Sequence, residues 1–152
     1  MRVAILADVH ANAPALEAVL KDVSAKNVSE IWYLGDFLGY GPYPNEVKRK
    51  LFQKCSRLII GNYDLNVLAF PQQQKRWKRK KHPSKFFLFK WTSHNTNQNN
   101  KEALKKLRIS DAFQWQGKRV LLVHGSPAGV ADPLRKDTPQ KRFLELARRS
   151  KS

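Results

Sequence analysis

The sequence predicts an α/β domain with a largely parallel sheet. Short continuous apolar runs alternate with stretches of helical periodicity, and the second and third runs each stop on a glycine. A continuous apolar run is typical of a strand that is buried on both faces, as parallel strands are between layers of helices. The length of 152 residues and the hydrophobic fraction of 41% suit one core. We therefore expect a single domain over residues 1–152.

The first strands and helices are expected in strict alternation. Residues 3–7 form the first apolar run, Pro14 opens a stretch with helical spacing, and residues 31–34 form the second run. Pro44 opens a further amphipathic stretch, and residues 58–60 form the third run. This order predicts a strand-helix-strand-helix-strand unit with right-handed crossovers.

The regular pattern lapses after the third run and its following turn. Residues 71–100 are rich in Pro, Gln, Lys and Asn, and we interpret them as a basic polar insertion or a partly helical excursion. Residues 101–107 predict a short helix. Residues 112–123 predict a β-hairpin around the turn-sized break Gln116-Gly117-Lys118. Pro139 follows a capping residue and predicts a final helix.

The net charge of +17 is concentrated in the second part of the chain. Residues 1–64 carry eight basic and seven acidic residues, whereas residues 65–152 carry twenty-one and five. Between Asp64 and Glu102 there is no acidic residue. A basic region of this kind attracts phosphate-rich partners, including nucleic acid. The alternative is a solvated surface with no specific partner.

Cysteine content and hydropathy exclude several classes of protein. The single cysteine, Cys55, excludes an internal disulfide framework and disfavours a thiolate metal cluster. Its apolar surroundings favour a buried structural thiol over a reactive one. No apolar run approaches the roughly 18 to 20 residues of a membrane span, and Asp8 interrupts the first run too early for a signal peptide. We expect a soluble cytoplasmic protein without a membrane partner.

Candidate metal ligands follow the strands of the predicted sheet. Asp8 and His10 follow the first run, Asp36 the second, Asn62 the third, and His124 the last strand. Reactive groups gather at the carboxyl ends of strands in an open α/β sheet, so these side chains should converge. Oxygen and imidazole ligands without thiolate favour manganese, iron or zinc. A pair of ions needs a bridging carboxylate, and Asp36 is the natural bridge. Each motif alone is weak, and ordinary turns are the alternative.

Four motifs together resemble the calcineurin-like metallophosphoesterase family, specifically its small prokaryotic phosphatase and phosphodiesterase branch. They are Asp8-Val9-His10, Gly35-Asp36 leading into Gly39-Tyr40-Gly41-Pro42, Gly61-Asn62-Tyr63-Asp64, and His124-Gly125-Ser126-Pro127. The resemblance spans nearly the whole chain. It implies the N-terminal portion of a four-layer α/β/β/α sandwich that hydrolyses phosphomonoesters or phosphodiesters.

The resemblance also implies the cofactor and its ligands. Asp8, His10 and Asp36 would hold one divalent metal ion, and Asp36, Asn62 and His124 would hold a second. A hydroxide activated by the two ions would attack phosphorus. Manganese is the expected metal, with iron, zinc, nickel and magnesium as alternatives. The substrate is a phosphoester whose identity the sequence leaves open.

Two departures from the family pattern bear on activity. Tyr63 replaces a histidine proposed to protonate the leaving group, and a tyrosine with a pKa of about 10 is a poor acid near neutral pH. Asp64 is the candidate catalytic residue of this motif, because its counterpart orients that histidine; the alternative is that it caps the following helix. The family's final Gly-His-x-His block is absent, since no histidine follows His124. We expect a truncated and functionally impaired descendant of a longer chain.

A different reading is a nucleic-acid-binding module, or an inactive remnant, on a hydrolase scaffold. The basic run of residues 75–81 precedes four aromatic residues, Phe86, Phe87, Phe89 and Trp91. Positive charge interleaved with stacking surfaces is typical of single-stranded nucleic-acid binding. A solvated segment with core aromatics is the alternative for residues 75–91.

Overall fold

A three-stranded parallel sheet forms the centre of the protein. The structure, a computed structural model, describes residues 1–150. The strands are β1 (Val3–Leu6), β2 (Glu30–Tyr33) and β3 (Arg57–Leu58), in the order β1-β2-β3. In register, Leu6 pairs with Tyr33 and Tyr33 with Leu58. The three predicted apolar runs are therefore neighbouring strands of one parallel sheet.

Two helices connect these strands, as the sequence predicted. They are α1 (Ala13–Ser24) and α2 (Pro44–Lys54), and each has a proline in its first turn. Proline suits this position because the first N–H groups of a helix have no partner inside the helix. The alternating strands and helices are confirmed.

Adjacent residues of β2 face two different layers. Tyr33 packs into the main core with residues of α1 and α2, among them Leu16 and Leu51. Trp32 points to the opposite face and packs with Ile59 and Leu122. Because side chains alternate along a strand, the helices cover one face of the sheet and a later hairpin covers the other.

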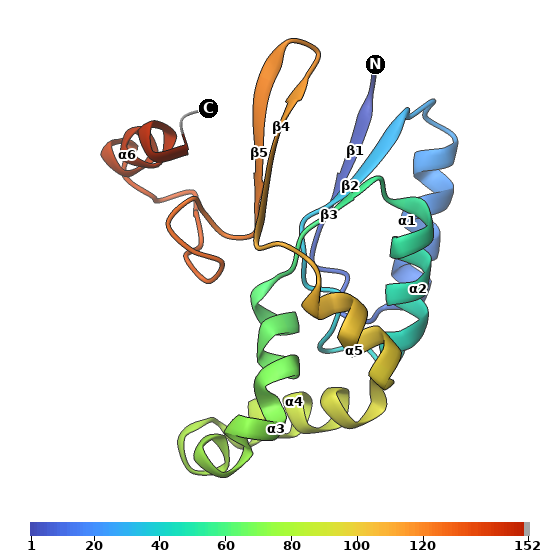
Figure 1. Cartoon of the computed structure of the whole chain (residues 1–152), viewed down its shortest axis with the longest axis vertical. Helices are drawn as coiled ribbons and strands as arrows, with labels where there is room; N and C mark the ends of the chain where they lie inside the picture. Colours follow the sequence, from blue (N-terminus) through green and yellow to red (C-terminus); the bar gives the residue numbers. More distant parts are fainter. Residues whose placement is uncertain (151–152) are drawn as a thin grey trace.

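The first strand is less covered than we expected. The prediction of burial on both faces is wrong for Ile5, whose residue surface is 58% exposed. β1 is an edge strand of the sheet. The cluster formed by Trp32, Ile59 and Leu122 packs on β2 and the end of β3. Figure 1 shows β1 at the margin of the sheet, which accounts for the exposure of Ile5.

The basic segment after β3 is helical and belongs to the main core. The helices are α3 (Asn62–Lys80), α4 (Pro83–Asn95) and α5 (Gln98–Lys105). Buried apolar residues from all three, such as Phe70, Phe89 and Leu104, join the cluster that contains Tyr33. The helicity is more extensive than the partial helicity we expected, because apolar residues recur between the lysines and face the core.

The last part of the described chain consists of a hairpin and one helix. β4 (Ser110–Trp115) pairs antiparallel with β5 (Lys118–Val123) around Gln116 and Gly117, which both have positive φ. This confirms the predicted hairpin, which forms a two-stranded sheet separate from the parallel one. The last helix, α6 (Gln140–Ser150), begins directly after Pro139. Figure 1 shows α6 standing away from the parallel sheet.

Over residues 1–150, no helix combines the length and the apolar character that crossing a bilayer requires.

Candidate metal centre

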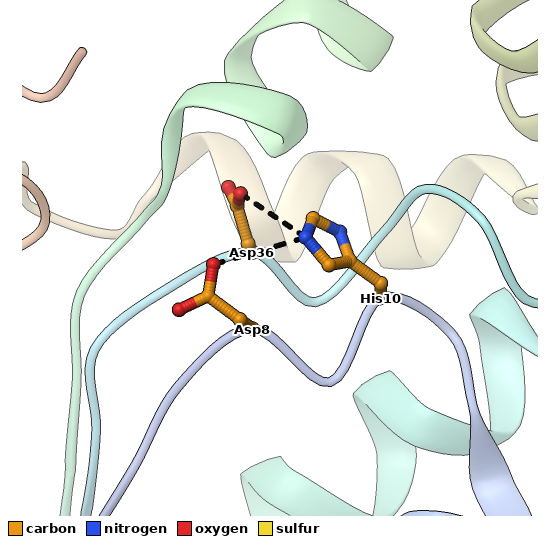
Figure 2. Close-up of side chains that lie close together, drawn as sticks. All are labelled: Asp8, His10 and Asp36. Atoms are coloured by element: carbon orange, nitrogen blue, oxygen red, sulfur yellow. Dashed lines mark ion pairs between the residues drawn. The ribbon is translucent and has the colours of Figure 1, made fainter. Parts of the chain in front are cut away.

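Three predicted ligands meet where β1 and β2 end. Figure 2 shows Asp8, His10 and Asp36 with their side chains directed toward one another. The Nε2 atom of His10 lies 3.7 Å from Oδ1 of Asp8 and 3.6 Å from Oδ2 of Asp36. One potential ligand atom from each residue lies within 4.8 Å of the others. The grouping has the size and composition of a cation site.

The remaining two predicted ligands complete the same cluster. The Nε2 atom of His124 lies 3.6 Å from Oδ2 of Asp36 and 2.8 Å from Oδ1 of Asn62. The same oxygen of Asp36 therefore lies between two imidazoles, at 3.6 Å from each. That is the position of a carboxylate able to bridge two ions. The structure thus brings all five residues together from four separate segments.

Hydrogen bonds fix which nitrogen of each imidazole faces the site. Nδ1 of His10 lies 2.9 Å from the carbonyl oxygen of Leu38, and Nδ1 of His124 lies 2.7 Å from that of Leu34. A carbonyl oxygen only accepts, so Nδ1 carries the proton and donates it in both residues. In the neutral imidazoles, each Nε2 then presents a lone pair to the site, as in metal-binding histidines.

The site consequently concentrates electron-pair donors. The lone pair of His10 faces two carboxylates, and that of His124 faces the amide oxygen of Asn62. Burial raises the pKa of Asp36, which is only 2% exposed, while the N–H of Tyr63 donates to its Oδ1 at 2.8 Å and opposes the rise. Divalent cations would relieve the mutual repulsion of these donors, and the mixed oxygen and nitrogen set fits them.

The backbone around the site is in an uncommon conformation. Asp8, His10, Ala11 and Asp36 have φ values of 58°, 49°, 59° and 61°. They are four of the six non-glycine residues with positive φ in the described chain. Left-handed backbone at non-glycine residues is sparse and clusters at functional sites. Cross-strand bonds hold it here, including the N–H of His10 donating to the carbonyl of Asp36 at 3.0 Å.

Asp64 holds the backbone around Asp36 through hydrogen bonds. Its carboxylate accepts the backbone N–H groups of Asp36 and Leu38, each at 2.9 Å, and of Gly61 at 3.1 Å. Asp64 is fully buried, and burial raises its pKa to about 7. These contacts match the helix-capping alternative and make Asp64 a positioning residue for Asp36.

Two glycines allow the ends of β2 and β3 to come this close. A Cβ atom at Gly61 would lie 2.1 Å from Oδ1 of Asp36, and one at Gly35 would lie 2.5 Å from the nitrogen of Gly61. Both distances are far below van der Waals contact. The glycines that stop the second and third apolar runs are therefore required by the approach of the two loops.

The comparison with protein families agrees with this geometry. The model of the calcineurin-like phosphoesterase family matches residues 1–150. The chain belongs to the calcineurin-like phosphoesterase family. The fold is correspondingly that of a metallophosphoesterase, with a parallel sheet and helices, as the four motifs predicted.

Individual relatives match most of this chain. An uncharacterized protein of Methanocaldococcus jannaschii is 30% identical over 82% of this chain and 49% of its own. A symmetrical bis(5'-nucleosyl)-tetraphosphatase of Buchnera aphidicola is 25% identical over 96% of this chain and 51% of its own. The solved structure of a hypothetical protein from Pyrococcus horikoshii OT3 matches with a TM-score of 0.84 at 24% identity, covering 98% of this chain and 65% of that one. The chain thus spans about half the length of these curated relatives.

Sequence reasoning missed one residue beside the metal centre. Lys85 of α4 donates to the hydroxyl of Tyr63, which is also hydrogen-bonded to that of Tyr40. Both tyrosine rings make edge contacts with His10, at centroid distances of 5.0 Å for Tyr40 and 4.8 Å for Tyr63. In the sequence Lys85 is one lysine among many in a basic stretch, so only the packing of α4 distinguishes it.

The aromatic residues of the basic segment divide between core and surface. Phe89 is buried, Phe86 packs on the main core, and Lys81 lies over the ring of Trp77. Only Phe87 among the three phenylalanines is largely exposed, at 65%. Residues 75–91 therefore offer no row of stacking rings, and the alternative of a solvated basic segment with core aromatics describes them better.

Proposed function

We propose that the chain is a metal-dependent phosphoesterase that hydrolyses phosphomonoesters or phosphodiesters with two divalent metal ions. One ion would be held by Asp8, His10 and Asp36, and the other by Asp36, Asn62 and His124. The convergence of two carboxylates, an amide oxygen and two imidazole Nε2 atoms is the observation that supports this most directly. Both histidines donate through Nδ1 to backbone carbonyls and keep Nε2 for a cation.

Different residues of the chain would have different roles in the proposed reaction. When bound, two divalent ions supply Lewis acidity and a water-derived nucleophile near neutral pH. Asp36 orients toward both imidazoles, and Asp64 fixes its backbone. The ring of Tyr63 contacts His10, and its hydroxyl accepts a hydrogen bond from the ammonium of Lys85. These two groups would meet the phosphate or its leaving group.

The substrate proposed for this site is a phosphoester of a nucleotide. The relative named as a bis(5'-nucleosyl)-tetraphosphatase supports this choice, and so does the ammonium group of Lys85 near the metal ligands. Manganese is the proposed metal, since the site offers oxygen and imidazole donors and no thiolate.

Hydrolysis by the purified full chain tests the proposal. Bis-p-nitrophenyl phosphate and p-nitrophenyl phosphate are assayed with manganese, and then with iron, zinc, nickel or magnesium. Asp36→Asn should lower the rate by at least about 100-fold, because loss of a bridging ligand exceeds the effect of removing a supporting hydrogen bond. Asp22→Asn is the control, since Asp22 lies on the surface of α1 and pairs with Lys26. Equal rates for the wild type and Asp36→Asn would refute the proposal.

A further inference from the structure

A pocket opens between the loop after β2 and helix α4. Its volume is about 370 Å³, within the range of small-molecule sites. Aromatic side chains from both sides line it: Tyr40 from the loop, and Phe87 and Trp91 from α4. Leu88 and Pro42 complete its apolar walls. The proposed chemistry at the metal centre does not use this pocket.

The pocket shares a wall with the metal centre. A Cβ atom at Gly39, in the lining of the pocket, would lie 2.8 Å from Nδ1 of the ligand His10. The ring of Tyr40 lines the pocket and also contacts the imidazole of His10. The pocket therefore lies directly beside one of the proposed ligands of the metal centre.

The positively charged ammonium group of Lys85 lies near both the pocket and the metal centre. The Lys85 ammonium donates to Tyr63 and lies 3.4 Å from the hydroxyl of Tyr40. Within residues 1–150 no carboxylate forms an ion pair with this ammonium group, which contacts the hydroxyls and rings of Tyr40 and Tyr63. An ammonium group held by neutral partners remains free to neutralise a phosphate oxygen.

We infer that the pocket between Tyr40, Phe87 and Trp91 binds the base of a nucleoside phosphoester, with Lys85 binding a phosphate oxygen between the base and the metal centre. This inference rests on the proposed function. Planar bases stack on aromatic side chains, and the exposed face of Phe87 is available for such a contact. The pocket would then be a subsite that makes the ester-hydrolysing centre specific for nucleoside phosphoesters.

The test compares how the full chain, with manganese, binds adenosine diphosphate and inorganic pyrophosphate. The comparison separates the contribution of the base from that of the phosphates. Calorimetry gives both dissociation constants. Phe87→Ala should weaken adenosine diphosphate about 10-fold, because it removes one stacking surface, and leave pyrophosphate unchanged. Phe87→Leu should show most of this loss, since it keeps apolar area without a ring. Lys85→Met should weaken both ligands.

Two matched variants control for nonspecific effects. Phe143→Ala removes a ring that is 44% exposed on α6, and Lys90→Met removes an exposed charge from α4. Both should bind the ligands as the wild type does. An unchanged affinity of Phe87→Ala for adenosine diphosphate, or an equal loss for both ligands, overturns the subsite. So does a wild type that binds pyrophosphate as tightly as adenosine diphosphate.

The failure of the subsite and the failure of the proposed function give different results. A wild type that hydrolyses bis-p-nitrophenyl phosphate but shows no preference for the nucleotide refutes the subsite alone. A wild type without hydrolysis that still prefers the nucleotide in a Phe87-dependent way refutes the hydrolytic function and supports the subsite.

Discussion

The first 107 residues and the rest of the described chain contribute to the same site but are held very differently. The first region contains the main core, in which residues of all five helices α1–α5 pack on the sheet. The second region joins it chiefly through a small cluster, Trp32 with Ile59 and Leu122, and an ion pair of 2.7 Å between Arg57 and Asp111. Figure 1 shows the hairpin and α6 beside the helical body. Four of the proposed ligands thus lie in a well-packed scaffold, whereas His124 depends on the docking of one hairpin.

The largest expected effect comes from removing one ligand in each region. His10→Ala and His124→Ala should each lower hydrolysis by at least about 100-fold and weaken manganese binding, because each loses an imidazole donor. Steady-state kinetics and calorimetry measure these changes. His94→Ala is the control, because His94 is exposed on α4. Full activity in His124→Ala would show that the second region does not contribute to the site.

Substitutions in the first region should lower the free energy of unfolding more than substitutions in the second. Asp64→Ala leaves three buried N–H groups in the first region without their acceptor, which should cost about 3 kcal/mol or more in the free energy of unfolding. Asp111→Ala removes a partly exposed ion pair in the second region and should cost about 1 kcal/mol or less. Urea denaturation measures both. A larger loss for Asp111→Ala would reverse the comparison.

The pH dependence of stability should also originate in the first region. Burial raises the pKa of Asp64 to about 7, well above the ordinary aspartate value of about 4, so between these two values the folded state holds a proton that the unfolded state has released. Without metal, the free energy of unfolding should therefore fall as the pH rises from about 4 to about 7. Asp64→Asn should flatten this slope. Urea denaturation at both pH values checks it, and an unchanged slope in the variant would contradict the assignment.

Hydrogen exchange should show the same division without any substitution. Amides of β1, β2 and the buried part of α3 should be the most protected, since they open only with the main core. Amides of α6 should exchange fastest among the helices, because each of the helices α1–α5 contributes residues to the main core and α6, within the described chain, does not. Mass spectrometry of exchanged peptides measures this, and equal protection of α6 and α1 would contradict it.

The smallest effect concerns the thiol of Cys55. Burial raises its pKa to about 12, and the residue is only 9% exposed. At about pH 8 the folded protein should react slowly with iodoacetamide, and urea should speed the reaction greatly. Rapid labelling of the native protein would show that the core beside α2 opens readily.

Sequence patterns were sufficient where local chemistry determines the structure. Proline in the first turn and apolar spacing locate α1 and α2, and the glycine in the Gln116-Gly117 turn locates the hairpin. The ligands were found because strand ends converge at one edge of a parallel sheet. That these five side chains bind metal stays a prediction, although the structure brings them together.

Other features depend on contacts that a sequence does not display. The exposure of Ile5 depends on which elements cover the edge strand, and the burial of Phe89 is not evident from a sequence in which lysines stand on both sides of it. Lys85 meets Tyr40 only because α4 packs near the loop after β2. These are properties of tertiary packing, which local composition does not encode.

The left-handed backbone at Asp8, His10 and Asp36 constrains how this site can change over evolution. Asp, Asn and His are the non-glycine residues that tolerate this conformation best, whereas β-branched residues strain it. If the proposed metal site were lost in a descendant, the fold would be kept most easily by exchange of aspartate for asparagine or glycine. The left-handed backbone at these three positions thus limits which substitutions an inactive lineage can accept without straining the fold.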